Sequence, residues 1–136
     1  MASLLKIINP RPPVNTADGG HVVEIFRGDS EIRSDLGVLK AAAIITVKPG
    51  ARAAGHYHEK KREILHLVRG ELKAFFQDRI KQERVELLWQ AGTRITLWPG
   101  MEHVFENTGA EEAIILEFSS LAYDPQDPDV RKARLS

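Results

Sequence analysis

The sequence predicts an all-β protein, either a sandwich or a barrel. Short apolar or alternating runs, separated by Gly, Pro and Asp, recur at the spacing of about 8 to 12 residues that is typical of such folds. Helical periodicity is scarce, and the predicted strands leave little room for helices. The length of 136 residues favours a single domain, and no repeat, low-complexity segment or linker divides the chain.

The predicted strands follow one another along the chain between short turns. They are Leu4–Ile8, Val22–Phe26, Val38–Val47, Glu63–Val68, Glu71–Gln77, Arg84–Trp89, Arg94–Trp98, His103–Glu106 and Ala113–Phe118. Residues that favour turns separate them, as in KPG at 48–50, RGE at 69–71, AGT at 91–93, WPG at 98–100 and NTGAEE at 107–112. The stretch ELKAFFQDRIKQERVELLWQ predicts a long hairpin with a polar tip near Asp78–Gln82.

The composition excludes several classes of function. Without cysteine there are no disulfides, thiolate metal sites or cysteine nucleophiles, and a metal site would have to use histidine and carboxylate. Lysine and arginine number 19, as do aspartate and glutamate, so no net charge would attract nucleic acid or an anionic membrane. The apolar run Leu4–Ile8 is too short for a signal peptide or a membrane span. We therefore expect a soluble, cytoplasmic protein that binds neither nucleic acid nor membranes.

The stretch HYHEKKRE contains three candidate metal ligands. Side chains alternate between the faces of a strand, so His56 and His58 should point the same way and Tyr57 the opposite way. The charged EKKR at 59–62 predicts a solvated turn. Glu63 would then begin the next strand, where its carboxylate could meet the two histidines above an apolar floor.

A fourth candidate ligand lies far along the chain, in WPGMEHVFEN. A Pro-Gly turn precedes His103, which should share a strand face with Phe105 and Asn107. His103 could therefore approach the same point from a separate strand.

The spacing of these residues resembles that of the cupins. The first cupin motif is Gly, five residues, His, one residue, His, three or four residues, Glu, six residues, Gly, and every spacing is met by Gly50, His56, His58, Glu63 and Gly70. This agreement identifies the stretch as the first cupin motif.

The second cupin motif is also present, with one departure. The motif is Gly, five residues, Pro-x-Gly, two residues, His, three residues, Asn, and it is matched by Gly92, Gly100, His103 and Asn107. Trp98 stands where the family usually has proline, and Pro99 is displaced by one residue, which we interpret as a local variation of the turn.

The resemblance implies a six- to eight-stranded antiparallel jelly-roll β-barrel, usually dimeric, with a metal inside. It implies one cupin domain over residues 1–136, with the two-motif barrel at about 35–120, N-terminal strands in 1–34 and a C-terminal tail in 121–136. The ligands carried over are His56, His58, Glu63 and His103, while Asn107 and the glycines would be structural. Three imidazoles and one carboxylate suit a divalent Fe, Mn, Ni, Co or Zn ion and leave one or two coordination positions open for substrate or water.

Two further stretches resemble the sugar-nucleotide branch of the cupins, the dTDP-sugar epimerases and ketoisomerases and the cupin domains of capsular-polysaccharide enzymes. These stretches are HLVRGELKAFFQD at 66–78 and YDPQDPD at 123–129. The epimerases of that branch use a metal-free site with an arginine, a lysine and a tyrosine acid. Here Ala53 occupies the arginine position and Glu63 the lysine position, so their catalytic set is absent.

Three functions remain open at this point. The first is a metal-dependent isomerase or epimerase that acts on a small polar or sugar-derived carbonyl compound, in which Tyr57 would take part only if it turned inward. The second is an Fe(II)-dependent dioxygenase, for which the same four ligands serve equally well. The third is a non-catalytic module that binds a metal and a small ligand. The sequence identifies no general acid or base.

The remaining distinctive residues have structural interpretations. His66 should face away from Glu63, on the outer face of the strand or at an interface, and His21 has no identifiable partner. Trp89 and Trp98 are expected in the core or at its rim, although Trp98 could line the mouth of the barrel. The tail AYDPQDPDVRKARLS predicts an irregular segment along the surface.

Overall fold

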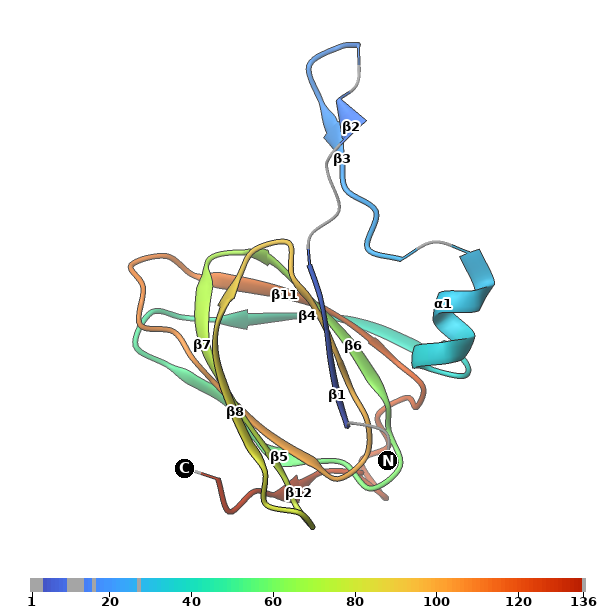
Figure 1. Ribbon diagram of the computed structural model, residues 1–136, viewed down its shortest axis with the longest axis vertical. Coiled ribbons are helices and arrows are strands. Elements are labelled where there is room, and N and C mark those ends of the chain that lie inside the picture. Colours follow the sequence, from blue (N-terminus) through green and yellow to red (C-terminus); the bar gives the residue numbers. More distant parts are fainter. Residues whose placement is uncertain (1–3, 10–13, 16, 27, 136) are drawn as a thin grey trace.

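Two five-stranded antiparallel sheets form the body of the molecule (Figure 1). The computed structural model describes residues 4–9, 14–15, 17–26 and 28–135. The strand order is β1, β9, β6, β11, β4 in the first sheet and β12, β5, β10, β7, β8 in the second. A short ribbon, β2–β3, extends away from both sheets, and the helix α1 lies beside the first sheet (Figure 1).

The chain passes repeatedly from one sheet to the other. The first sheet consists of β1 (Leu5–Ile8), β9 (Arg94–Leu97), β6 (Glu63–Arg69), β11 (Ala113–Ser119) and β4 (Ala41–Val47). The second consists of β12 (Arg131–Lys132), β5 (Arg52–Tyr57), β10 (Met101–Glu106), β7 (Glu71–Asp78) and β8 (Arg84–Gln90). The ribbon is β2 (Val14–Asn15) with β3 (His21–Val22), and α1 is Gly28–Asp35. The predicted antiparallel jelly roll is confirmed, as two facing sheets that do not close into a barrel within the described residues.

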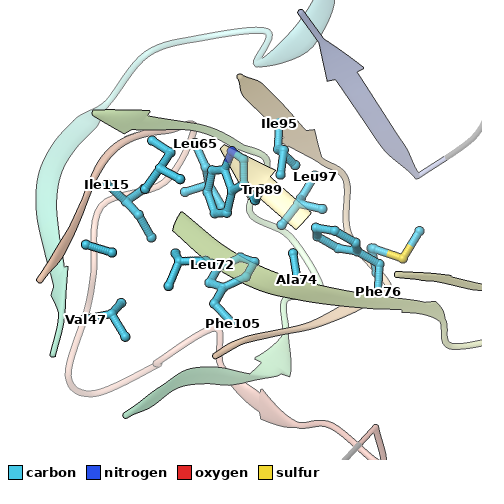
Figure 2. Close-up of a cluster of buried hydrophobic side chains, with 13 residues drawn as sticks. Val47, Leu65, Leu72, Ala74, Phe76, Trp89, Ile95, Leu97, Phe105 and Ile115 are labelled. Carbon is cyan, nitrogen blue, oxygen red and sulfur yellow. The ribbon is translucent and has the colours of Figure 1, made fainter. Parts of the chain in front are cut away.

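The hydrophobic core fills the space between the two sheets (Figure 2). It contains Val47, Leu65, Leu67, Leu72, Ala74, Phe76, Trp89, Ile95, Leu97, Met101, Phe105, Ala113 and Ile115. Trp89 is fully buried, and its Nε1 donates a hydrogen bond to the carbonyl of Thr93 at 2.9 Å, which satisfies its polar atom. Trp89 therefore belongs to the core, as the sequence predicted.

Helix α1 has only eight residues and agrees with the expectation that the strands leave little room for helices, although no helix was predicted at this place. Its last residue, Asp35, is buried and binds three groups of the first sheet: Lys6 Nζ at 3.0 Å, Arg94 Nη2 at 3.4 Å and Thr96 Oγ1 at 3.1 Å. Eight mostly polar residues are too few to show a helical period, and no local pattern reveals ion pairs with distant strands. Among the residues described, no helix is long and apolar enough to cross a membrane.

Most predicted strands are confirmed to within one or two residues at each end, but two are wrong in part. Of Val22–Phe26, only Val22 lies in a strand, and in Val38–Val47 the strand begins at Ala41. Phe26 at the end of the first segment serves another purpose, because its ring packs edge-on against Phe118 of β11 with centroids 5.2 Å apart. Apolar side chains in a loop that covers a sheet resemble a strand in sequence.

The long hairpin is confirmed as β7 and β8, which pair from Glu71 with Gln90 to Gln77 with Arg84. At its tip, Oδ1 of Asp78 accepts hydrogen bonds from the backbone N–H groups of Ile80 (2.9 Å) and Lys81 (3.0 Å). This side-chain capping of a turn is the usual role of aspartate at such a position. The hairpin also holds β10, because β7 is hydrogen-bonded to both strands.

Candidate metal centre

The four predicted ligands come together between the two sheets. His56 lies on β5, His58 directly follows that strand, and His103 lies on β10, where it pairs with His56. Glu63 begins β6 and belongs to the opposite sheet. The site is therefore built by residues from both layers of the fold.

An irregularity in β5 sets the direction of the histidines. Ala51 and Ala53 pack against the core, so strict alternation would send residues 55 and 57 inward as well. Ala54 and Gly55 have positive φ angles of 67° and 82°, and the register with β10 shifts between His103 and Val104. A bulge of this kind reverses the alternation, and it turns the odd-numbered side chains outward and the even-numbered ones inward.

The three imidazoles form a compact group. One ring nitrogen from each of His56, His58 and His103 lies within 4.8 Å of the other two. His58 and His103 are buried and His56 is partly exposed. Three nitrogen donors at this separation can hold one divalent ion.

Hydrogen bonds to main-chain carbonyls orient two of the rings. His103 Nδ1 lies 3.0 Å from the carbonyl oxygen of Met101, and His58 Nδ1 is hydrogen-bonded to the carbonyl of Asp129. Because a carbonyl can only accept, each Nδ1 carries a proton, so each neutral ring would present the lone pair of its Nε2 to a metal. This is the arrangement in which metal-binding histidines are usually held.

The carboxylate of Glu63 supplies the fourth donor. Its Oε1 lies 2.8 Å from His58 Nε2 and 3.7 Å from His103 Nε2, and its side chain is only 3% exposed. Apart from each other, Glu63 Oε1 and His58 Nε2 have no hydrogen-bond partner among the described residues, although both are buried, and while Nε2 is unprotonated the two atoms cannot satisfy each other. Unsatisfied buried atoms are costly, and a cation coordinated by them would remove that cost. The donor set therefore fits a divalent metal ion.

The protonation states also suit a metal. Burial lowers the pKa of His56 to about 4, with further lowering by His103 and His58, and burial likewise lowers the pKa of His103. Burial acts in the same direction on His58, but Glu63 and the Asp129 carbonyl outweigh it and raise the pKa of His58. Burial would raise the pKa of Glu63, yet His58 and its other neighbours hold that pKa well below its usual range. Glu63 is thus ionised, and His56 and His103 are neutral, as ligands must be.

Two residues that the sequence interpretation missed support Glu63 from its other side. Lys61 Nζ lies 3.9 Å from Glu63 Oε2 and 3.6 Å from Glu117 Oε2, and its side chain is 17% exposed. The Glu117 carboxyl is hydrogen-bonded to Glu63 and accepts a hydrogen bond from Ser119 Oγ at 3.3 Å. Burial and then Glu63 raise the pKa of Glu117 to about 7, so it can share a proton with Glu63. The expectation that EKKR at 59–62 is a wholly solvated turn is therefore wrong for Lys61.

The altered second motif preserves its turn. Gly100 adopts a positive φ of 92°, and the N–H of Met101 approaches the carbonyl of Trp98 at 3.3 Å. The N–H of Gly100 donates to the carbonyl of His58 at 2.9 Å. The displaced Pro99 therefore leaves intact a turn that ties the two motifs together, and Trp98 at its start is partly buried.

The other residues singled out in the sequence lie elsewhere. His66 is on the opposite face of β6 from Glu63, next to Arg94 of β9. The ring of Tyr57 lies under the guanidinium of Arg79, 4.8 Å from its carbon, on the face of β5 opposite His56. Tyr57 therefore does not turn inward. The side chain of His21 is outside the described part of the structure.

Comparison with known proteins places this fold and site in context. The family model described as "Polysaccharide biosynthesis C-terminal domain" matches residues 18–131. No curated protein matches the chain significantly in sequence.

Three of the similar solved structures differ in fold similarity and coverage. ChmJ, a 3′-monoepimerase from Streptomyces bikiniensis solved with dTDP-quinovose, has a TM-score of 0.76 and 20% identity over 90% of this chain and 67% of its own. QdtA, a sugar 3,4-ketoisomerase from Thermoanaerobacterium thermosaccharolyticum solved with TDP, has a TM-score of 0.73 and 17% identity over 98% of this chain and 91% of its own. The capsular polysaccharide assembling protein CapF from Staphylococcus aureus has a TM-score of 0.65 and 22% identity over 92% of this chain and 33% of its own.

These similarities confirm the cupin fold that the motif spacing predicted. The chain spans about two thirds of the length of the sugar epimerases that it matches, and a third of CapF. At identities of 17% to 22% the likeness is one of fold.

Proposed function

Since the chain belongs to the polysaccharide biosynthesis C-terminal domain family, we propose that it is a metal-dependent isomerase or epimerase acting on a sugar-derived carbonyl compound. The observation that carries the proposal is the buried contact between His58 Nε2 and Glu63 Oε1, two donor atoms that have no hydrogen-bond partner of their own among the described residues. His56, His58, Glu63 and His103 are the proposed ligands of one divalent transition-metal ion. The ion would polarise the carbonyl group of a bound substrate.

The substrate class follows from the proteins that this chain resembles. ChmJ, a 3′-monoepimerase, was solved with a dTDP-sugar, and QdtA, a sugar 3,4-ketoisomerase, was solved with TDP. We therefore propose a nucleotide-linked keto sugar as the small-molecule substrate. The reaction would exchange a proton on a carbon next to the carbonyl group, as every epimerisation or ketoisomerisation of such a sugar requires.

The residues of the chain would hold and shield the site. The carbonyls of Met101 and Asp129 fix the rings of His103 and His58, and burial of Glu63 keeps water from its carboxylate. In such a dry environment each charged group acts more strongly than it would in water. Glu63 stands at the position where the motif comparison places lysine in the metal-free epimerases. A carboxylate that can bind a metal ion therefore takes the place of a positively charged side chain.

A homodimer is part of the proposal. Ile44 of β4 and Leu116 of β11 are register partners on the outer face of the first sheet, and the side chain of Ile44 is 70% exposed. Val68 of β6 is 48% exposed. Apolar groups exposed on one sheet favour an interface with a second copy. Light scattering after gel filtration would measure the mass in solution, and Ile44→Lys should shift a dimer toward monomer.

The expected cytoplasmic location stays a prediction.

Proton exchange tests the proposed activity. Protein purified without chelator is analysed for metal and then incubated in D₂O with a dTDP-linked 4-keto-6-deoxy sugar, and proton NMR follows the hydrogens next to the carbonyl. We expect deuterium to enter at one of these positions without oxygen uptake. Chelation and the variants His56→Ala and His103→Ala should abolish the exchange, whereas His66→Ala, which alters a histidine outside the site, should retain it.

Other outcomes would identify another function. Oxygen uptake measured with an electrode in the presence of Fe(II) would indicate a dioxygenase. A rise in melting temperature with metal and sugar nucleotide, but no exchange, would indicate a binding module. Exchange that continues at an unchanged rate after complete removal of metal would contradict the proposed role of the four ligands.

A further inference from the structure

The C-terminal segment is more than the irregular surface tail that the sequence predicted. Residues 120–135, which we call the C-terminal strap, run along the first cupin motif. The strap includes β12, whose residues Arg131 and Lys132 pair with Tyr57 and His56 of β5. The N–H of Ala133 continues this pairing by donating to the carbonyl of Gly55 at 3.0 Å. The strap thus extends the second sheet next to two proposed ligands.

The strap also holds the turn between the ligands. Ser120 and Arg62 are joined twice, because Arg62 N–H donates to Ser120 Oγ at 2.9 Å and Ser120 N–H donates to the carbonyl of Arg62 at 3.1 Å. At the outer end, Lys60 Nζ lies 3.5 Å from Asp127 Oδ2, and both side chains are exposed. The ends of the turn are therefore tied to the strap by different kinds of contact.

Asp129 makes the central contact with this turn. Its Oδ1 accepts the N–H of Glu59 at 2.9 Å, and its Oδ2 accepts the N–H groups of Lys60 at 2.9 Å and Lys61 at 2.8 Å. Three consecutive backbone donors on one carboxylate form an anion-binding turn that is filled by the protein's own side chain. The carboxylate of Asp129 therefore holds the centre of the turn that leads from His58 toward Glu63.

The main chain of the same residue binds a proposed ligand. The carbonyl of Asp129 accepts a hydrogen bond from His58 Nδ1. The side chain thus anchors Asp129 to the turn, while its carbonyl fixes the proton of His58 on Nδ1 and directs Nε2 toward Glu63. Groups in this position, behind the metal ligand, set the orientation and the basicity of the imidazole.

We propose that Asp129 is a positioning residue of the metal centre, through which the C-terminal strap sets the orientation of His58 and the affinity for the metal. The inference rests on the proposed function in that His58 is taken as a ligand, but it does not require any catalytic activity. It assigns a role in the metal site to YDPQDPD at 123–129, beyond its use as a mark of family resemblance.

Asp129→Asn tests this role against a merely structural one. An amide has one oxygen in place of two, so at least one of the three backbone donors would face an NH₂ group, and the turn and the carbonyl of residue 129 should shift. Asp127→Asn is the matched control, since Asp127 lies in the same strap, is exposed and contacts Lys60 only through its side chain at 3.5 Å. Both variants keep all 136 residues of the chain and replace one carboxylate oxygen by an NH₂ group.

Binding of Co²⁺ alone provides the measurements. We expect Asp129→Asn to raise the Kd for Co²⁺ by about 10- to 100-fold, the range seen when groups behind metal-binding histidines are altered, and to change the visible absorption bands of the bound ion. Asp127→Asn should change the Kd by less than about twofold and leave the bands unaltered. Equal Co²⁺ affinity and equal spectra for wild type and Asp129→Asn would overturn the proposal. A wild type that binds no Co²⁺ would instead refute the proposed ligand set.

A second measurement needs no variant of Asp129 and serves if Asp129→Asn does not fold. Long-range ¹H–¹⁵N correlation spectra of the metal-free wild type report which ring nitrogen of His58 carries the proton, with the signals assigned by comparison with His58→Gln. The proposal requires the proton on Nδ1. A ring that carries a proton on Nε2 and none on Nδ1 would show that the Asp129 carbonyl does not fix the ring, and would overturn the proposal even if the four ligands bind metal.

Discussion

His58 Nε2 and Glu63 Oε1 lie 2.8 Å apart, and both are buried with no other hydrogen-bond partner among the described residues. A buried polar atom without a partner costs about 1 to 3 kcal/mol. The two side chains carry opposite charges only while His58 is protonated. Burial lowers the pKa of His58, but the contact with Glu63 outweighs burial, so the pKa of His58 is raised. In the absence of metal, the site therefore depends on one proton to hold two ligands together.

Removal of metal should lower the stability of the protein. A metal present at about 100 times its Kd stabilises the folded state by about 2.7 kcal/mol, which for a chain of this size corresponds to a rise in Tm of roughly 10 °C. We expect this difference between samples with excess Co²⁺ and samples with chelator in thermal unfolding followed by circular dichroism. His103→Gln should remove the difference, and His66→Gln should retain it. An equal response of the two variants would exclude His103 as a ligand.

The ligand residues could be predicted because their spacing is fixed by local geometry. His56 and His58 share a strand face, and the turn after them returns the chain at Glu63, so the sequence contains the information for three ligands. The bulge at Ala54 and Gly55 could not be predicted, since an alanine with positive φ carries no sequence signal. Without that bulge the same two histidines would share a face, but on the outside of the sheet.

The residues behind the ligands depend on contacts between distant segments. Asp129 reaches His58 across 71 positions of sequence, and no local pattern relates the two. Glu117 did carry a usable signal, because it follows Ala113 and Ile115 at alternate positions and is thus a charged residue on a face directed at the core. A carboxylate at such a position requires a buried partner, which here is the Glu63 and Lys61 pair.

Two glycines of the first motif should respond differently to substitution by alanine. Gly50 and Gly70 have similar φ angles of 80° and 88°, so alanine at either position should cost about 1 to 2 kcal/mol of backbone strain. A Cβ at Gly50 would have no atom within 4 Å, whereas one at Gly70 would lie 2.9 Å from Ala113 Cα. Overpacking of this kind adds about 1 to 3 kcal/mol. Urea denaturation should show a clearly larger loss for Gly70→Ala, and equal losses would contradict the close approach of β6 and β11.

Asn107 should prove structural. Its Nδ2 donates to the carbonyls of Val47 at 2.9 Å and Glu111 at 2.7 Å, and its Oδ1 accepts the N–H of Gly109 at 3.0 Å. Asn107→Ala leaves these groups without partners in a site that is 1% exposed, and we expect a loss of about 2 to 4 kcal/mol in the free energy of unfolding. Asn15→Ala, at an exposed position, should change it by less than about 0.5 kcal/mol. Co²⁺ affinity of the folded Asn107→Ala protein should stay within a few-fold of wild type, and its complete loss would place Asn107 in the site.

His66 should make the stability depend on pH in a defined direction. It is buried on β6, and burial, followed by the charge of Arg94 on β9, lowers its pKa below the ordinary value of 6.5. Arg94 is itself paired with Glu31 and Asp35 of α1, and Leu116 of β11 is the other register neighbour of His66. His66 is therefore protonated at a lower pH in the folded protein than in the unfolded chain.

The sign follows from proton binding. Below about pH 6.5 the unfolded state binds more protons at His66 than the folded state does, so stability falls as the pH drops through 6.5 toward the lower folded pKa, by at most about 1.4 kcal/mol per pH unit. Above pH 6.5 the contribution is complete. Urea denaturation from pH 7.5 to 5.5, in chelator, should show a steeper decline for wild type than for His66→Gln, while the site histidines titrate in both proteins and cancel in the difference. A difference that stays constant over this range would mean that His66 is not held in its neutral form.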